Sequence, residues 1–122
     1  MNFDLTAEQQ LLQQTVERFV TDNYDLASRR KLADSPQGYS DDNWSQMAEL
    51  GWLALPFDEA DGGFGGNQID TMIVMEQFGR GLVVEPFFAN IVLGGGMLKR
   101  SENQALKTNL LPGIIAGDVQ LT

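Results

Sequence analysis

The sequence predicts an all-α fold, an orthogonal bundle of about five to six helices formed by residues 1–122 as one domain. Apolar residues recur at helical spacing through most of the chain, and residues that typically begin or end helices separate these stretches. With 43% apolar and 20% charged residues, a chain of 122 residues can bury one core of ordinary composition but not two.

The first helix is expected from Thr6 to about Tyr24. Thr6 and Gln9 form a capping-box pattern, and the apolar stripe that follows consists of Leu12, Val16, Phe19 and Val20. A shorter second helix is expected from Asp25 to Ala33. Its basic cluster, Arg29-Arg30-Lys31, fits a solvated helix face and also fits an anion or subunit contact.

Ser40 is the expected N-cap of the next helix, and Gly51 is well placed to end it as a left-handed residue. Asn67 is the expected N-cap of a longer helix that ends near Gly79, where Gly79-Arg80-Gly81 should break it. This longer helix is apolar over so much of its surface that it should be buried on more than one side, by this chain or by a partner.

Between these two helices lies the stretch Leu50–Gly66, which combines an apolar run, a proline, three acids and five glycines. The apolar run Trp52–Leu55 must be covered, and Pro56 stops helix growth. The acids Asp58, Glu59 and Asp61 fit a carboxylate site for acid–base work or a hard cation, and they also fit an exposed turn. The glycines at 62–66 resemble a phosphate cradle but lack its flanking strand or its Lys-Ser/Thr ending, so turns and close chain approach explain them better.

A fourth helix is expected from about Pro86 to Arg100, with the triplet Gly94-Gly95-Gly96 inside it. Each glycine costs a helix interior about 1 kcal/mol relative to alanine, so the triplet needs a reason. Close packing against a neighbour, space for a ligand, and a helix break are the three that fit. Ser101 and Gln104 form a second capping-box pattern, and Pro112-Gly113 should end or kink the last helix.

Composition excludes several classes of function. A formal charge of −9 disfavours binding to nucleic acid or to an anionic membrane. The absence of Cys and His removes thiol chemistry and the commonest metal ligands, so no metal site is expected. The N-terminus lacks the pattern of a secretory signal, and no apolar run approaches the ~20 residues of a membrane span. A cytoplasmic protein without a membrane span is the expectation.

The order of short motifs resembles the N-terminal helical domain of the acyl-CoA dehydrogenases, over essentially the whole chain. The matching segments are Phe3-Asp4-Leu5-Thr6 with Glu8-Gln9, Leu50-Gly51-Trp52-Leu53 with Pro56, Glu59 with Gly62–Gly66, Glu76-Gln77-Phe78-Gly79, and Leu111-Pro112 with Ala116-Gly117-Asp118. Within the family, Gly79–Phe87 and Val92–Gly96 look most like the small subunit of pimeloyl-CoA dehydrogenase-type enzymes.

The resemblance implies a piece of an enzyme that dehydrogenates an acyl-CoA thioester between its α and β carbons. In this family FAD and the catalytic glutamate are held mainly by a central β-domain and a C-terminal helical domain. The chain stops about where the β-domain would begin. The resemblance therefore implies no catalytic or cofactor-binding residue here, and we expect the 122 residues alone to be inactive and not to hold FAD tightly. It also implies an electron acceptor such as an electron-transfer flavoprotein, and homo- or hetero-oligomeric subunits.

By position, the family's acyl-pocket lining falls on the start of the fourth helix. The candidates are Pro86, Phe87, Asn90 and Leu93, with Gly94 opposite the end of the acyl chain. Core packing is the alternative for each of them, and a buried Asn90 needs a hydrogen-bond partner, either a backbone group or the substrate. Two other functions stay open from the sequence: a helical protein-interaction module, and a flavin oxidase or monooxygenase on the same fold.

Overall fold

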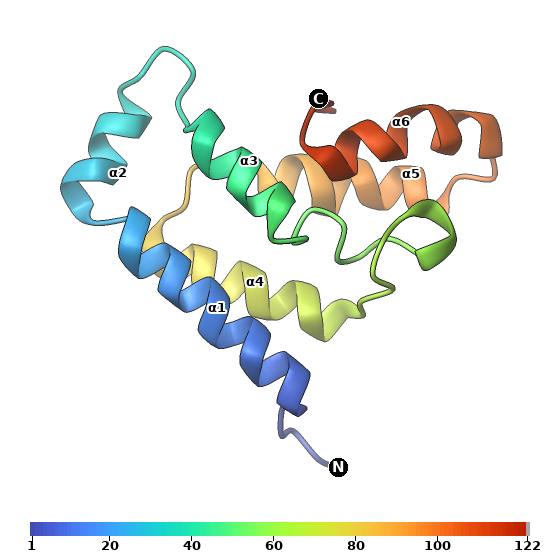
Figure 1. Ribbon diagram of the computed structural model, residues 1–122, viewed down its shortest axis with the longest axis horizontal. Helices are drawn as coiled ribbons and strands as arrows, with labels where there is room; N and C mark the ends of the chain where they lie inside the picture. The colour runs from blue at the N-terminus through green and yellow to red at the C-terminus, as the bar shows by residue number, and fades with distance from the viewer. Residues whose placement is uncertain (122) are drawn as a thin grey trace.

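The computed structural model describes residues 1–121, and this range is all-helical with no strand (Figure 1). The predicted all-α bundle is confirmed. Its elements are α1 (Ala7–Asn23), α2 (Leu26–Ala33), α3 (Asp41–Glu49), a 3₁₀ turn η1 (Glu59–Asp61), α4 (Gln68–Gly81), a π-helix η2 (Phe88–Gly95), α5 (Gly96–Arg100) and α6 (Gln104–Ala116). No helix in residues 1–121 is long and apolar enough to cross a membrane.

Helices α1 and α4 lie side by side and run in the same direction (Figure 1). At their N-terminal ends, Gln9 Nε2 donates to Asp70 Oδ1 at 3.1 Å. At their C-terminal ends, Gly81 lets the two backbones approach, because a Cβ there would overlap Val20. Helix α6 lies along η2 and α5 and also contacts α3, which closes the bundle on the other side.

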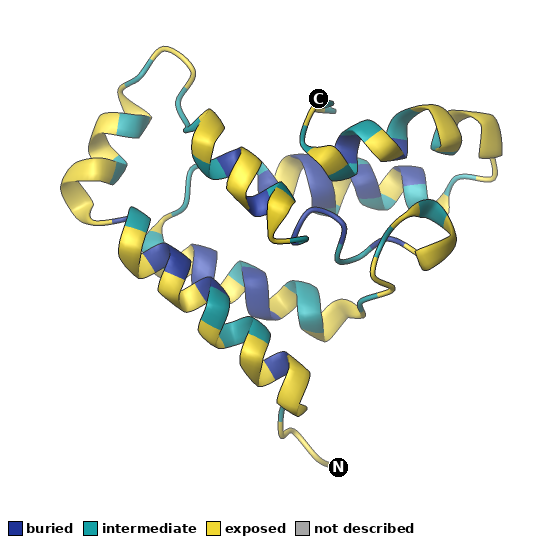
Figure 2. Cartoon of the chain, in the orientation of Figure 1, coloured by how far each residue is buried: buried dark blue, intermediate teal, exposed yellow. Residues whose placement is uncertain are grey.

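The buried positions lie on the helix faces and loop that point into the bundle (Figure 2), and four buried aromatic residues among them form a row. The Trp52 ring packs edge-to-face between Phe19 at 5.2 Å and Phe78 at 6.1 Å, and Phe78 packs in the same way on Phe87 at 5.2 Å. Each such pair contributes about 0.5–1.5 kcal/mol beyond its buried area. The row ties α1, the segment after α3, α4 and the start of η2 into one core.

The stretch Leu50–Gly66 folds back on itself inside the bundle. The predicted covering of Trp52 is confirmed, since that ring and Leu53 are buried. Gly51 ends α3 with φ of 81°, as predicted. Backbone bonds then close the loop, because Gly65 N donates to Phe57 O at 2.8 Å and Gly66 N to Leu55 O at 2.8 Å. This loop connects α3 to α4 without any regular strand.

Two predicted helix boundaries are wrong. Helix α4 continues through Gly79 to Gly81, where the chain packs closely on Val20, and Leu82 ends it with φ of 54°. The N-cap of α6 is Asn103 and not Ser101, since the Asn103 side chain accepts from Leu106 N at 3.0 Å. Of the two effects predicted for Pro112-Gly113, the end of the helix does not occur there, since α6 continues to Ala116, and a kink stays a prediction.

The glycine triplet does not break the fourth helix, which runs from η2 directly into α5. Two of the three glycines are closely packed. A Cβ on Gly94 would lie 2.9 Å from Leu121 Cβ, and one on Gly95 would lie 2.6 Å from the Phe57 ring. Of the three interpretations, close packing therefore holds for Gly94 and Gly95. Gly96 is half-buried and borders a cavity, and a Cβ there would meet only the flexible Arg100 side chain, at 3.4 Å.

Candidate functional site

The five residues predicted to line an acyl pocket differ in how far the fold leaves them accessible. Phe87 and Asn90 are buried, Pro86 and Gly94 are half-buried, and Leu93 is 51% exposed. Phe87 belongs to the aromatic row and Gly94 packs against the C-terminal segment. Only Leu93 presents most of its side chain outward from η2. Substrate contact by these residues stays a prediction.

The Asn90 side chain is fully engaged within the chain. Its Nδ2 donates to Val119 O at 3.2 Å, and its Oδ1 accepts from Leu121 N at 2.6 Å. This amide therefore pairs with the extended backbone that follows α6, in the way a neighbouring strand would. Of the two partners open from the sequence, the backbone group is the one that the structure places beside Asn90.

We expect Asn90→Ala to lower the free energy of unfolding by about 2 kcal/mol, because it leaves the buried groups of Val119 and Leu121 without partners. Urea unfolding followed by far-UV circular dichroism measures the change. Gln104→Ala is the control, since that amide bonds only to exposed Thr108. An equal loss in both variants would contradict this assignment.

One cavity, here named the Glu85 cavity, has a volume of about 310 Å³ and lies where α4 ends and η2 begins. Its walls are mostly apolar and include one cation and one carboxyl group. The lining residues are Arg29, Met75, Phe78, Gly79, Leu82, Val83, Glu85, Phe87 and Phe88. Among the five predicted pocket residues, Phe87 is the one that lines this cavity.

Glu85 is only 5% exposed although it carries a carboxyl group. Its Oε2 accepts from Ser40 N at 3.4 Å, at the start of α3, while Oε1 has no hydrogen-bond partner within residues 1–121. Burial raises the pKa of Glu85 to about 7, against the lowering effect of the backbone hydrogen bonds. Arg29 lies at the same cavity and is held there by a bond from its Nε to Leu82 O at 3.2 Å.

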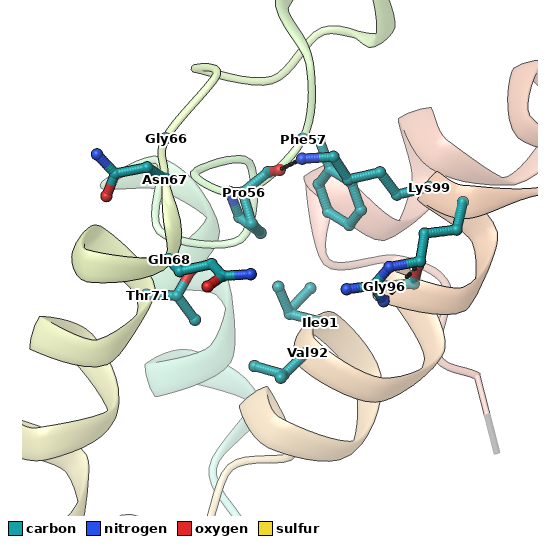
Figure 3. Close-up of a pocket in the computed structure, with 11 residues that line it drawn as sticks. Pro56, Phe57, Gly66, Asn67, Gln68, Thr71, Ile91, Val92, Gly96 and Lys99 are labelled. Carbon is teal, nitrogen blue, oxygen red and sulfur yellow. Dashed lines mark hydrogen bonds between the residues drawn. The ribbon is translucent and has the colours of Figure 1, made fainter.

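The second cavity, the Gly66–Lys99 cavity, has a volume of about 480 Å³ and separates the start of α4 from η2 and α5 (Figure 3). Gln68 and Thr71 face Ile91 and Val92 across it. The Lys99 ammonium group is already engaged, since it donates to Pro56 O at 2.7 Å and pairs with Asp58 at 3.6 Å. None of the predicted pocket residues lines this cavity.

The acids that stood out in the sequence do not form a site. Asp58 and Glu59 are exposed beside the turn η1, and no group of three or more acids within residues 1–121 could hold a metal ion. Glu76 is partly exposed and pairs with Arg80 at 3.4 Å on the surface of α4. The exposed positions of Asp58 and Glu59 support the exposed-turn interpretation of these acids.

Comparison with known proteins identifies the family. The family profile described as "Acyl-CoA dehydrogenase, N-terminal domain" matches residues 6–118. The chain belongs to the acyl-CoA dehydrogenase family. A probable acyl-CoA dehydrogenase of Bacillus subtilis (strain 168), YngJ, is 30% identical, with 100% of this chain and 33% of the relative covered. The acyl-CoA dehydrogenase IpdE2 of Mycobacterium tuberculosis is 32% identical, with 93% of this chain and 36% of the relative covered.

Solved structures agree with this assignment. The crystal structure of the ChsE4-ChsE5 complex from Mycobacterium tuberculosis superposes with a TM-score of 0.90 at 25% identity, over 100% of this chain and 34% of that one. The chain thus spans about one third of the length of the relatives it matches. The family resemblance predicted from the sequence is confirmed.

The acyl-CoA dehydrogenase family implies FAD, so the described residues can be tested for a flavin site. The glycines at 62–66 offer no pyrophosphate cradle, because a Cβ on Gly63 would overlap Phe57 O and one on Gly66 would lie 2.6 Å from Leu55 O. That loop is packed on its own backbone. Lys99 is already engaged with Pro56 O and Asp58, so this loop and Lys99 do not fit a flavin diphosphate.

Glu85 is the residue that sequence reasoning missed. In the sequence, Glu85 stands out only as the residue before Pro86, and a proline restricts the backbone geometry of the residue that precedes it. The sequence does contain a signal, because Glu85 is the one acid within the apolar run Leu82-Val83-Val84-Glu85-Pro86-Phe87-Phe88. A carboxyl group in such a run is either exposed on a turn or buried at a cost in free energy. In this acyl-CoA dehydrogenase domain it is buried.

Proposed function

We propose that this chain is the N-terminal helical domain of a longer, FAD-dependent acyl-CoA dehydrogenase. The observation that carries the proposal is the family match over residues 6–118 together with coverage of about one third of each relative. The reaction is α,β-dehydrogenation of an acyl-CoA thioester, in which FAD supplies the redox chemistry when bound. The flavin site and the catalytic base belong to the rest of the parent protein.

The contribution of this domain is an apolar wall that keeps water from the acyl chain. Removing water strengthens the electrostatic interactions at a thioester, so a dry slot assists the reaction. Several large apolar side chains are exposed around η2, including Phe88 at 51% and Leu93 at 51%. The negative surface disfavours coenzyme A phosphates, so the coenzyme head is held elsewhere in the parent.

The parent transfers its electrons to a protein acceptor such as an electron-transfer flavoprotein, acts in the cytoplasm, and assembles with further acyl-CoA dehydrogenase subunits. The assembly is supported by the similarity of this fold to the ChsE4-ChsE5 complex, which has two components. The exposed apolar residues Ile69 and Met72 of α4 fit burial against other parts of such an assembly.

The test is expression of the parent polypeptide with the remaining two thirds of the length seen in relatives. We expect a yellow protein that reduces a dye in the presence of acyl-CoA, and a 122-residue chain that is colourless and inactive. A colourless parent that leaves acyl-CoA unchanged would overturn the proposal. A parent that consumes oxygen in place of reducing the dye would make it an oxidase.

We expect Leu93→Trp in the parent to move the preferred acyl chain to a shorter one, because the larger side chain fills the slot. The ratio of kcat/KM for long over short acyl-CoA should fall about tenfold. Leu11→Trp is the matched control, since Leu11 is exposed on α1, which packs against α4. An unchanged ratio in Leu93→Trp would remove Leu93 from the acyl pocket.

A further inference from the structure

The segment that follows α6 is held against the bundle by side chains from two other helices. Asn90 of η2 donates from Nδ2 to Val119 O at 3.2 Å and accepts at Oδ1 from Leu121 N at 2.6 Å. Trp44 of α3 donates from Nε1 to Gly117 O at 3.1 Å. Segments beyond the last helix of a domain are poorly ordered unless they are tied down, so these bonds give residues 117–121 a defined path.

Two glycines make room for the same segment. A Cβ on Gly94 of η2 would lie 2.9 Å from Leu121 Cβ, and one on Gly113 of α6 would lie 2.5 Å from Val119 Cγ2. Both distances are shorter than real Cβ contacts, so a side chain at either glycine would push the segment outward. Asn90 and Gly94 are four residues apart on η2 and hold the segment together, one by hydrogen bonds and one by close packing. We name this pair the exit clamp.

The amide of Asn90 fixes a direction as well as a position. Its Nδ2 group donates and its Oδ1 atom accepts, which is the combination that a passing backbone needs. The two bonds reach residues 119 and 121, as the bonds of a neighbouring strand would. A single bond would leave the segment free to turn about one point, whereas two bonds at alternate residues set its course.

The exit clamp shares its helix with the proposed wall of the acyl slot. Phe88 and Leu93 of η2 are each 51% exposed, and Leu93 is the neighbour of Gly94 in the chain. The path of the segment and the position of the wall are therefore set by one short helix. Whatever follows the segment is placed relative to this wall through the exit clamp.

We propose that the exit clamp sets the position of the rest of the parent protein against η2. The inference deepens the proposed function and rests on it, because it takes the segment after α6 to be the connection to the part that holds FAD. It makes Asn90 a positioning residue for the acyl slot, which acts through Val119 and Leu121 and not by touching the substrate.

Hydrogen exchange in the 122-residue chain tests the exit clamp itself. The Leu121 N–H donates to Asn90, whereas the Gln120 N–H takes part in none of the backbone hydrogen bonds within residues 1–121. After correction for intrinsic rates, we expect the Leu121 amide to exchange about tenfold more slowly. Asn90→Leu should remove this difference, and Gln104→Ala should keep it. Equal exchange of the two amides in the unsubstituted chain would overturn the inference.

The parent enzyme tests the positioning, through the ratio of kcat/KM for long over short acyl-CoA. Asn90→Leu should lower this ratio roughly tenfold, because a long acyl chain lies along more of η2 and depends more on how the rest of the parent closes over it. Lower stability alone reduces the active fraction equally for both substrates. Val16→Ala is the control for stability, since Val16 is buried in α1. An unchanged ratio in Asn90→Leu, or an equal fall in Val16→Ala, would overturn the inference.

A double-mutant cycle separates positioning from direct contact between Asn90 and the substrate. Leu121→Pro removes the N–H that Asn90 Oδ1 accepts and leaves η2 unchanged. It should lower the ratio as Asn90→Leu does, and the double variant should be no worse than either single one, because both remove the same bond. Independent effects that multiply would overturn the inference. If Leu121→Pro does not fold, Gly94→Ala serves instead, since its methyl group would displace Leu121 from the same place.

The outcomes distinguish this inference from the proposed function. A parent that oxidises acyl-CoA with the same ratio in every variant overturns the inference alone. A parent that leaves acyl-CoA unchanged overturns the proposed function. The exchange of the Leu121 amide in the 122-residue chain then decides on the exit clamp, which a protected amide supports and an unprotected one overturns.

Discussion

Gly63→Ala is expected to lower the free energy of unfolding by about 3 kcal/mol, at the upper end of what overpacking costs. A Cβ at Gly63 would overlap Phe57 O and lie 2.6 Å from Phe57 Cβ. The carbonyl cannot turn away, because it accepts from Gly65 N at 2.8 Å. The Phe57 ring cannot move either, because it is buried against Gly95. Thermal and urea unfolding of the 122-residue chain measure the loss.

Gly79→Ala provides the matched comparison. Gly79 is exposed in α4, and a Cβ there would have no neighbour within 4 Å. Alanine is the better helix former by about 0.8–1 kcal/mol, so this variant should be more stable than the unsubstituted 122-residue chain. Glycine-to-alanine substitution should therefore lower the free energy of unfolding at Gly63 and raise it at Gly79. A similar small effect at both would show that the Leu50–Gly66 loop is not packed as described.

The sequence predicts helix ends well where a local side chain makes the cap. Thr6 and Asn67 cap α1 and α4 through bonds to residues two or three positions on, and both were predicted. Local pattern could not choose between Ser101 and Asn103, since both can cap and they are two residues apart. Helix α4 continues past Gly79, and at Gly81 it packs closely on Val20, which lies about sixty residues earlier. No local signal in the sequence indicates that contact.

The candidate site was less predictable than the fold for the same reason. Asn90 was singled out as a buried amide, but its partners lie at Val119 and Leu121, about thirty residues away. Glu85 depends on Ser40, which is 45 positions earlier. Helix pattern records which face of an element is apolar, but not which distant backbone group will meet a polar side chain on it. The cavities therefore emerge only from the packed structure.

Glu85 is expected to make the stability of the chain depend on pH between about 4.5 and 7. The ordinary pKa of this carboxyl is 4.5, and burial raises it to about 7 in the folded chain. The folded state therefore binds the proton more tightly than the unfolded state. The stabilisation is fully present below pH 4.5 and is lost as pH rises through 7. At 1.36 kcal/mol per pKa unit, the rise from 4.5 to about 7 corresponds to a loss of about 3 kcal/mol.

Glu85→Gln isolates this contribution from the general repulsion within a chain of net charge −9. Glutamine resembles the neutral acid in shape, and its carbonyl can still accept from Ser40 N. The variant should match the unsubstituted chain in stability at pH 4.5, exceed it by about 3 kcal/mol at pH 8, and show the weaker slope between them. Urea unfolding at a series of pH values measures the difference, with exposed Glu76→Gln as the control. Parallel pH profiles for Glu85→Gln and the unsubstituted chain would mean that the Glu85 carboxyl is as well solvated as a surface acid. That result would contradict its burial between α3 and η2.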